Sequence, residues 1–356
     1  MFKLFKALFV LASFLVSVWA YALPIESFAS LPDVSKVELS PSGEQLSSLI
    51  RVSMDNNKGT AVQVTNLKSG QSKIVLFTDN KKYDVYWISW KDEKTLLVGV
   101  IYPSKRDTWT GMSRILNKTR ETRLLIIDLE KDLVLSPLSN AFLKKYKYMP
   151  ISQDDVIDSL PDDPDHILME LPTNQSLVSS SYTGVYKVNF RDQTNHLYQG
   201  SEDYVYGWWT DQQHNVRAGM FIDDEGNRKT VLRKMPSDKW QAVWPYKIFS
   251  EEQVSPLGFG VDPNILYIRA YHEKRLAIFK VNLSSNELKR ELVFADSKYD
   301  VNGDLVYSPA TRDVIGITYS ANGGITFFDP DLKKLQASID KALPNNKNFI
   351  TSFSKD

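Results

Sequence analysis

Residues 88–98, Ile88-Ser89-Trp90-Lys91-Asp92-Glu93-Lys94-Thr95-Leu96-Leu97-Val98, contain the pattern that decides the fold. A short apolar strand ends in charged turn residues, and a second, more apolar strand follows at once. The same strand and turn occur at residues 37–43, 206–211, 257–263 and 305–309. This recurrence predicts a repeat architecture in which each unit is one supersecondary element.

Each unit contains four predicted strands, and the first strand is the one before the turn. The second strands are at residues 46–50, 96–100, 166–170, 216–221, 265–269 and 314–319. The third are at residues 61–65, 123–128, 185–190, 229–233, 276–281 and 325–328. The fourth and most polar, as suits an edge strand, are at residues 73–77, 133–135, 196–198, 240–243, 288–293 and 335–339.

The spacing of the units matches a four-stranded propeller blade. Their first turns begin at Ser40, Lys91, Pro161, Thr210, Val261, Ser308 and Ser354. Units of about 40–50 residues are typical of propellers. We therefore predict an all-β fold, a β-propeller of about six four-stranded blades.

Two parts of the chain depart from this repeat. Residues 102–122 lengthen the second unit without a strand pattern, so we predict an inserted basic loop; its cations are Lys105, Arg106, Arg114, Lys118 and Arg120. Phe349-Ile350-Thr351 is predicted to be the first strand of a seventh unit, which breaks off at Ser354-Lys355-Asp356. We therefore expect a truncated chain whose open sheet edge favours self-association.

The first residues have the features of a secretory signal peptide. Lys3 and Lys6 precede an apolar run at residues 7–18, and Ala20-Tyr21-Ala22 supplies the small residues of a cleavage site. Cleavage after Ala22 would leave a propeller at residues 23–356 and a periplasmic or secreted protein. An uncleaved membrane anchor is the alternative, because apolar character continues to Ile25.

Composition limits the classes of partner. The chain has 43 Lys and Arg residues and 43 Asp and Glu residues, so its formal net charge is zero. Nucleic acid is therefore not an expected partner, nor is a membrane beyond the signal segment. The chain has no cysteine, so core packing must supply the stability that disulfides give many exported proteins.

No candidate for catalysis or metal binding forms a complete motif. The four histidines, His166, His196, His214 and His272, are far apart in sequence and have no metal-ligand spacing. We assign His166 to the start of a strand and predict no catalytic, cofactor-binding or metal-binding residue. A self-sufficient enzyme with its site in the propeller channel would need converging groups that the sequence does not reveal.

Three other clusters have a structural and a functional interpretation. Glu251-Glu252 is interpreted as a solvated turn, although paired glutamates can bind an amino terminus. Residues 223–227, Asp-Asp-Glu-Gly-Asn, lack the spacing of a calcium loop, so we predict a hairpin turn in which Gly226 has a positive φ. Trp208 and Trp209 are expected to pack between blades, or one of them to face the central channel.

Three strings in the chain resemble the N-terminal propeller of exported serine peptidases of the prolyl oligopeptidase family, including acylaminoacyl and dipeptidyl peptidases. They are Leu31-Pro32-Asp33-Val34-Ser35 with Leu39-Ser40-Pro41-Ser42-Gly43, residues 88–98, and Ser159-Leu160-Pro161-Asp162-Asp163-Pro164-Asp165-His166-Ile167-Leu168. The resemblance runs from about residue 24 to the C-terminus. It implies a propeller of seven or eight blades that admits small peptides to an α/β-hydrolase domain with a Ser-Asp-His triad.

The sequence departs from that family in one decisive respect. It contains no Gly-x-Ser-x-Gly motif and no alternation of strands and helices for a hydrolase domain. Our first hypothesis is therefore the substrate-gating, non-catalytic propeller of an exported serine peptidase, inactive alone, with peptides as partners when a hydrolase domain is joined. The alternative is a stand-alone periplasmic propeller that binds a ligand or a protein.

Overall fold

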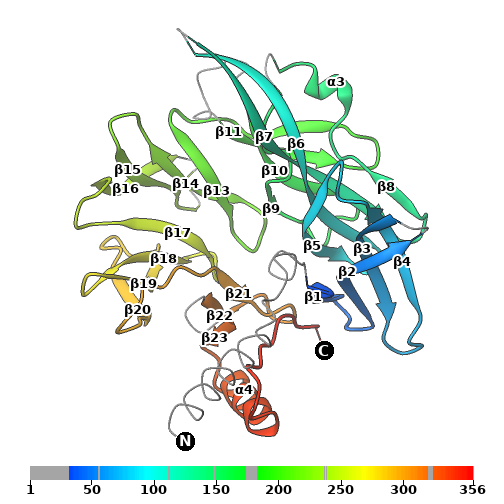
Figure 1. Ribbon diagram of the computed structural model, residues 1–356. Coiled ribbons are helices and arrows are strands. Elements are labelled where there is room, and N and C mark those ends of the chain that lie inside the picture. The colour runs from blue at the N-terminus through cyan, green and yellow to red at the C-terminus, as the bar shows by residue number, and fades with distance from the viewer. Residues whose placement is uncertain are drawn as a thin grey trace, which may run out of the picture. The chain divides into compact units, whose positions relative to one another are not determined.

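Six antiparallel sheets follow one another along the chain in a computed structural model (Figure 1). The structure describes residues 32–54, 57–110, 113–146, 149–173, 183–235, 237, 239–319 and 324–355. The predicted signal peptide and its cleavage site after Ala22 lie outside the described residues. No helix in the described part of the chain has the length and apolarity needed to cross a membrane.

The strands repeat in the predicted order. First strands are β1 (Val34–Leu39), β5 (Asp84–Asp92), β9 (Val156–Asp158), β13 (Val205–Thr210), β17 (Val254–Phe259) and β21 (Leu305–Tyr307). Second strands are β2 (Gln45–Met54), β6 (Thr95–Thr110), β10 (His166–Pro172), β14 (Val216–Ile222), β18 (Ile265–His272) and β22 (Val314–Tyr319). Third strands are β3 (Asn57–Asn66), β7 (Ser113–Asp128), β11 (Thr183–Asn189), β15 (Asn227–Arg233), β19 (Arg275–Asn282) and β23 (Gly324–Phe327). Fourth strands are β4 (Ser72–Thr78), β8 (Leu133–Leu135), β12 (Asn195–Gln199), β16 (Trp240–Lys247) and β20 (Arg290–Phe294).

The predicted all-β propeller of six units is confirmed. In the described residues, five sheets have four strands and the sixth has three, and each is a simple meander. We number the sheets as blades 1 to 6 in chain order.

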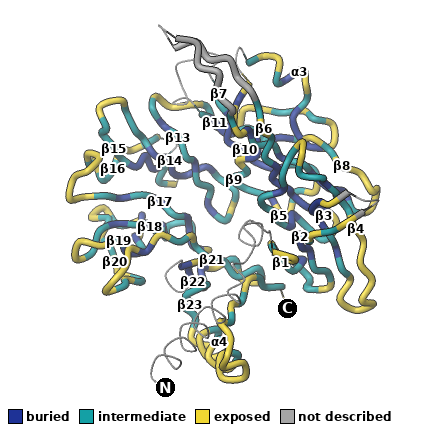
Figure 2. Tube along the Cα trace, viewed as in Figure 1, coloured by how far each residue is buried: buried dark blue, intermediate teal, exposed yellow. Residues whose placement is uncertain are grey.

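The hydrophobic core consists of layers between neighbouring blades. Leu96 and Val98 pack in a cluster with residues of blade 1, whereas Leu97, the residue between them, packs in a cluster with residues of blade 3. Successive side chains of a strand point to opposite faces, so both faces of this blade are buried. This burial explains why second strands are continuous apolar runs, and Figure 2 shows buried residues concentrated in them while outer strands are largely exposed.

Lys91, at the end of β5 where the first turn of blade 2 begins, links this blade to blade 3. Its side chain is only 2% exposed, and its ammonium donates to the carbonyl oxygens of Ser159, Leu160 and Asp163 at 2.6, 2.8 and 2.7 Å. Burial lowers the pKa of Lys91, while nearby carboxylates, Asp92 first among them, act in the opposite direction. Three carbonyl acceptors satisfy the three donors of an ammonium group, which makes burial of this charge possible.

First turns also connect other pairs of blades. The backbone N–H and the hydroxyl of Ser42 in blade 1 donate to the Glu93 carboxylate in blade 2, at 2.5 and 2.8 Å. The His214 ring in blade 4 lies 2.9 Å from the carboxylate of Asp158 in blade 3. Turn-to-turn contacts therefore accompany the apolar layers between blades.

Residues 349–355 lie between blade 6 and blade 1. The Phe353 ring is 5.8 Å from that of Phe327 in blade 6, and the Leu39 N–H in blade 1 donates to the Ser352 hydroxyl at 2.8 Å. The Lys355 N–H donates to the Pro41 carbonyl at 2.7 Å. The segment has no regular strand structure, so the prediction of a first strand of a seventh unit at residues 349–351 is wrong.

The prediction of an inserted loop at residues 102–122 is wrong. β6 and β7 continue through this stretch as one long hairpin, paired in register from Tyr102 with Glu121 to Thr110 with Ser113. Backbone groups form such a ladder, and side-chain alternation marks a strand only where one face is buried. The sequence therefore gave no pattern here although the strands continue.

The fourth strand predicted at residues 335–339 is also wrong. This stretch belongs to helix α4 (Pro330–Ala342); the only other helix in the described residues is the short α3 (Asn140–Leu143). The Asp329 side chain caps α4 by accepting from the Asp331 and Leu332 N–H groups, and Pro330 occupies the first turn. The apolar residues Leu332, Leu335 and Ile339 have helical spacing, which outweighs the edge-strand interpretation.

Replacement of Lys91 by methionine should strongly destabilise the fold. Lys91→Met leaves three buried carbonyl groups without a donor, so we expect the free energy of unfolding to fall by about 3 kcal/mol in urea denaturation. The matched control is Lys94→Met in the same turn, whose side chain is 62% exposed. Equal midpoints for the two variants would contradict the role given to Lys91.

The turn predicted at Gly226 is confirmed and provides a second test. Gly226 has φ +79°, its N–H donates to the Asp223 carbonyl at 3.1 Å, and a Cβ atom would lie 2.5 Å from Cγ2 of Ile248. Gly226→Val should lower the free energy of unfolding by about 1–3 kcal/mol. Gly70→Val shares the positive φ (+71°) but has open space around the new Cβ, so it should cost about 1 kcal/mol. Equal losses, measured by thermal unfolding, would show that the contact with Ile248 is unimportant.

Candidate functional site

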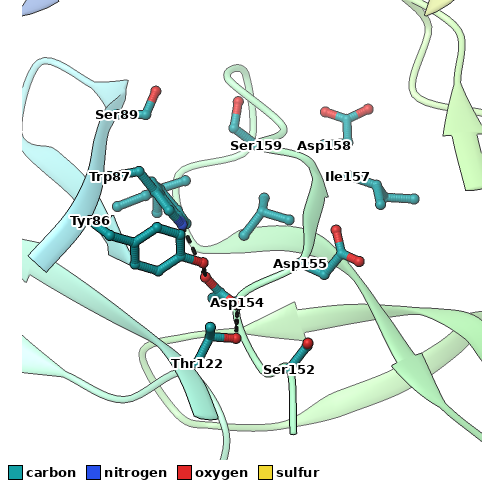
Figure 3. A pocket seen from close by; sticks show the side chains of 12 residues that line it. Tyr86, Trp87, Ser89, Thr122, Ser152, Asp154, Asp155, Ile157, Asp158 and Ser159 are labelled. Atoms are coloured by element: carbon teal, nitrogen blue, oxygen red, sulfur yellow. Dashed lines mark hydrogen bonds between the residues drawn. The ribbon is translucent and has the colours of Figure 1, made fainter. Parts of the chain in front are cut away.

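A cavity lies between blades 2 and 3. Its volume is about 540 Å³, and it is lined by Tyr86, Trp87, Ser89, Leu97, Thr122, Ser152, Asp154, Asp155, Val156, Ile157, Asp158 and Ser159. We call it the acidic pocket, because three aspartates and no lysine, arginine or histidine line it. Figure 3 shows side chains of β5 on one wall and the segment leading into β9 on the other.

An irregularity in β5 directs two adjacent aromatic side chains to one point. The register of β5 against β6 shifts between Val85 and Trp87, which leaves Tyr86 as an extra residue. In a regular strand the two neighbours would point to opposite faces, and such a bulge changes the direction of a side chain. Trp87 lies against Gly99, where a Cβ atom would approach the indole nitrogen to 1.9 Å. Glycine at position 99 therefore makes room for the tryptophan.

Asp154 is the carboxylate on which these side chains converge. The Trp87 indole N–H donates to Oδ2 of Asp154 at 3.0 Å, the Tyr86 hydroxyl donates to the same oxygen, and the Thr122 hydroxyl donates to Oδ1 (Figure 3). Asp154 is buried, with 7% of its surface exposed. Burial and the hydrogen bond to Asp154 raise the pKa of Tyr86 to about 12. Asp154 therefore has a mainly structural role, joining blade 2 to the segment before β9.

Asp155 is the carboxyl group available to a ligand. It is an exposed residue that lines the pocket. Reduced solvation of its carboxyl group raises its pKa to about 6, with repulsion from Glu170 and Asp154 as smaller causes. Its backbone carbonyl accepts from the Glu170 N–H at 2.9 Å, which fixes its position. No described side chain donates a hydrogen bond to its carboxyl group. A bound cation would favour the ionised form that the pocket now disfavours.

Asp158, the third acidic residue, also contacts the neighbouring blade. Its carboxylate oxygens lie 2.9 and 3.1 Å from Nδ1 of His214, and Oδ1 accepts from the Leu160 N–H at 2.9 Å. His214 lines a second, smaller cavity of about 260 Å³ with Leu160, Asp162, Asp163, Leu168, Lys187 and Tyr198. The Asp158–His214 pair therefore links the two cavities.

The structure does not bring the four histidines together. His166 begins β10 as predicted, and its Nδ1 lies 2.8 Å from Asp163. His196 is exposed on β12, and the His272 ring lies 6.1 Å from that of Phe279. In the described ranges no three His, Cys, Asp or Glu side chains are arranged to hold a metal ion.

The acidic and aromatic clusters singled out in the sequence lie outside the pocket. Glu251 and Glu252 are exposed before β17, and Glu252 pairs with Arg290 at 2.9 Å. Trp208 is buried in the cluster between blades 3 and 4, while Trp209 packs against the cluster of blades 4 and 5. Packing between blades is therefore the observed role of both tryptophans.

Sequence analysis missed the residues of the acidic pocket. Asp154 and Asp155 are adjacent acids just before a first strand, which was a usable signal, but nothing in the sequence pointed to their aromatic partners. Tyr86 and Trp87 come together only through the bulge in β5, and a bulge of this kind has no fixed sequence signature.

Comparison with known proteins gives matches in structure only. No protein-family model and no curated protein sequence matches this chain. An acylaminoacyl peptidase solved with Z-Gly-Gly-Phe-chloromethyl ketone is 13% identical, with a TM-score of 0.45, over 90% of this chain and 47% of that one. The chain thus spans about half the length of that peptidase.

Two further structures are matched over most of their own length. The β-propeller domain of the Trilobed protease from Pyrococcus furiosus is 13% identical, with a TM-score of 0.45, over 84% of this chain and 82% of that one. An oligogalacturonate lyase in complex with manganese is 10% identical, with a TM-score of 0.47, over 82% and 74%. All three likenesses are remote, with identities of 10–13% and TM-scores of 0.45–0.47, and they do not indicate a function.

The raised pKa of Asp155 predicts a pH-dependent stability. An unfolded chain releases the Asp155 proton near pH 4, but the folded protein keeps it until about pH 6, so the free energy of unfolding falls across this interval as pH rises. Asp155→Asn removes this loss. With allowance for solvent screening, we expect it to be more stable than the parent by about 0.5–1 kcal/mol at pH 8, and equal to it at pH 4.

The control for this measurement is Asp224→Asn, a change of the same charge at an exposed turn outside the pocket. In thermal denaturation, the free energy of unfolding of Asp224→Asn should differ from that of the parent by the same amount at pH 4 and at pH 8. A flat difference for Asp155→Asn as well would mean that this carboxyl group titrates normally.

Proposed function

We propose that this chain is a non-catalytic, exported propeller that binds peptides and restricts their access to a serine peptidase active site on another domain. The sequence resemblance to the prolyl oligopeptidase family supports this role. The lack of a Gly-x-Ser-x-Gly motif supports the absence of peptidase activity in this chain itself.

The acidic pocket is the observation that carries the proposal. A cavity of about 540 Å³ is large enough for an amino-acid side chain, and its three aspartates face no cationic residue in the lining. The Trp87 and Tyr86 rings add apolar and π surface beside these carboxyl groups, an environment that suits a protonated amine or a guanidinium. We therefore expect a lysine side chain, an arginine side chain or an amino terminus of a peptide to enter the pocket.

The alternative function is a stand-alone periplasmic propeller that binds a ligand or a protein. The contacts of Ser352, Phe353 and Lys355 favour it, because they join the first and the sixth blade to one another. Both functions use the same pocket. They differ in whether a hydrolase domain receives the bound peptide.

Calorimetric titration with two blocked tripeptides tests the pocket. Acetyl-Gly-Lys-Gly-amide should bind at least about tenfold more tightly at pH 8 and low salt than its norleucine analogue, which has similar shape but no charge. Asp155→Asn should weaken binding of the lysine peptide about five- to tenfold, whereas Asp224→Asn should leave it unchanged. High salt should weaken it too. Equal affinities for the two peptides would refute cation recognition.

A further inference from the structure

We infer that His214 sets the charge of the acidic pocket through Asp158, so that a cation entering the pocket competes with a proton on His214. The inference rests on the proposed function, because it concerns how that same site is regulated. It gives a role to a histidine that belongs to a different blade from the pocket and does not line it.

The first support is the position of Asp158. Its carboxylate is part of the pocket lining, and its side chain is only 9% exposed because His214 covers it from blade 4. The ring nitrogen Nδ1 approaches both carboxylate oxygens, at 2.9 and 3.1 Å. One carboxylate is therefore shared between a possible ligand on the pocket side and an imidazole on the other.

The second support is that His214 is held in place by its own backbone. It has φ +67°, its N–H donates to the Asp211 carbonyl at 2.9 Å, and its carbonyl accepts from the Tyr198 hydroxyl at 3.2 Å. A non-glycine residue in this region of φ carries a conformational cost. The turn thus presents the imidazole to Asp158 in one defined position.

The other charged groups near His214 are already paired with one another. Asp162 bonds Arg312 of blade 6 at 2.6 Å, and Asp163 bonds Lys187 of β11 at 2.8 Å. Asp162 also interacts electrostatically with His214 at longer range, and Lys355 contributes to the field at Asp162. The buried Lys91 ammonium also acts electrostatically on Asp158. No Lys or Arg lies within salt-bridge distance of Asp158 among the described residues, so protonated His214 is the cation in direct contact with it.

The two protonation states of His214 give the pocket different charges. A neutral imidazole donates a hydrogen bond from Nδ1–H to Asp158. The proton stays on the ring, so the carboxylate keeps its full negative charge. A protonated imidazole forms an ion pair with Asp158 and cancels that charge. Because a cation in the pocket and a proton on His214 both draw on the same carboxylate, each must weaken the binding of the other by the same factor.

The pH dependence of peptide binding separates this coupling from the titration of Asp155. Between pH 8 and pH 5 the parent protein should lose affinity for acetyl-Gly-Lys-Gly-amide by about 100-fold, since two pocket charges are neutralised. His214→Gln keeps a side-chain N–H for Asp158 but cannot gain a proton, so its loss should be about tenfold. His196→Gln, the same change at an exposed site, should follow the parent.

A direct titration gives a second readout that does not need a variant. The NMR signal of the His214 ring should titrate at a lower pH when the protein is saturated with the lysine peptide, and it should not move with the norleucine peptide. A shift of the titration midpoint by half a pH unit or more would correspond to at least about threefold coupling.

The outcomes distinguish the two proposals. Absence of lysine-peptide binding to the parent at pH 8 would overturn the proposed function. Binding at pH 8 with the same pH profile in the parent and in His214→Gln, or an unmoved His214 titration, would overturn the present inference alone. If His214→Gln does not fold, the NMR titration of the parent decides.

Discussion

The buried ammonium of Lys91 is the interaction on which the arrangement of blades 2 and 3 depends. It satisfies three carbonyl groups of one turn, and that turn directly follows Asp158 and the other residues of the pocket wall. A second buried cation lies within blade 4, where Arg217 of β14 bonds Asp211 at 3.0 Å and both side chains are 1% exposed. Apolar layers supply most of the stabilising area between blades, but they are not directional. The directional hydrogen bonds of the buried Lys91 ammonium therefore constrain how blade 3 meets blade 2.

The bulged first strands convert this regular scaffold into a site. In blade 2, Trp87 lies opposite Gly99, and in blade 4, Trp208 lies opposite Gly219. At each bulge a carboxylate from a neighbouring part of the ring accepts hydrogen bonds. Asp154 does so at the bulge of blade 2. At the bulge of blade 4, Glu170 accepts from the backbone N–H of Trp208 at 3.1 Å. The same construction is therefore used twice. At the bulge of blade 2 a further acid, Asp155, follows the anchoring carboxylate and lines the cavity of about 540 Å³.

The repeat and its first turns could be predicted from the sequence because burial on both faces makes second strands apolar and turn residues interrupt them. The hairpin of β6 and β7 could not, because its ladder is made by the backbone. The helix at residues 330–342 was predictable from its Asp-Pro start and from the helical spacing of Leu332 and Leu335. A strand was predicted there instead, because each of the other units ends in a fourth strand. The burial of Lys91 could not be predicted, because nothing in a single sequence reveals that three carbonyl groups from another blade surround it.

The acidic pocket illustrates why charge in a sequence and charge in a site are different quantities. The whole chain is neutral, and two of the three pocket aspartates have partners that use them structurally: neutral donors for Asp154 and an imidazole for Asp158. Neutral donors leave the negative charge of Asp154 in place. The imidazole cancels the charge of Asp158 when it is protonated. If the pocket binds a cation as proposed, its affinity depends on Asp155, which lines the cavity, and on His214 of blade 4, which contacts Asp158. The proposed site then includes the interface between blades 3 and 4 as well as the pocket lining.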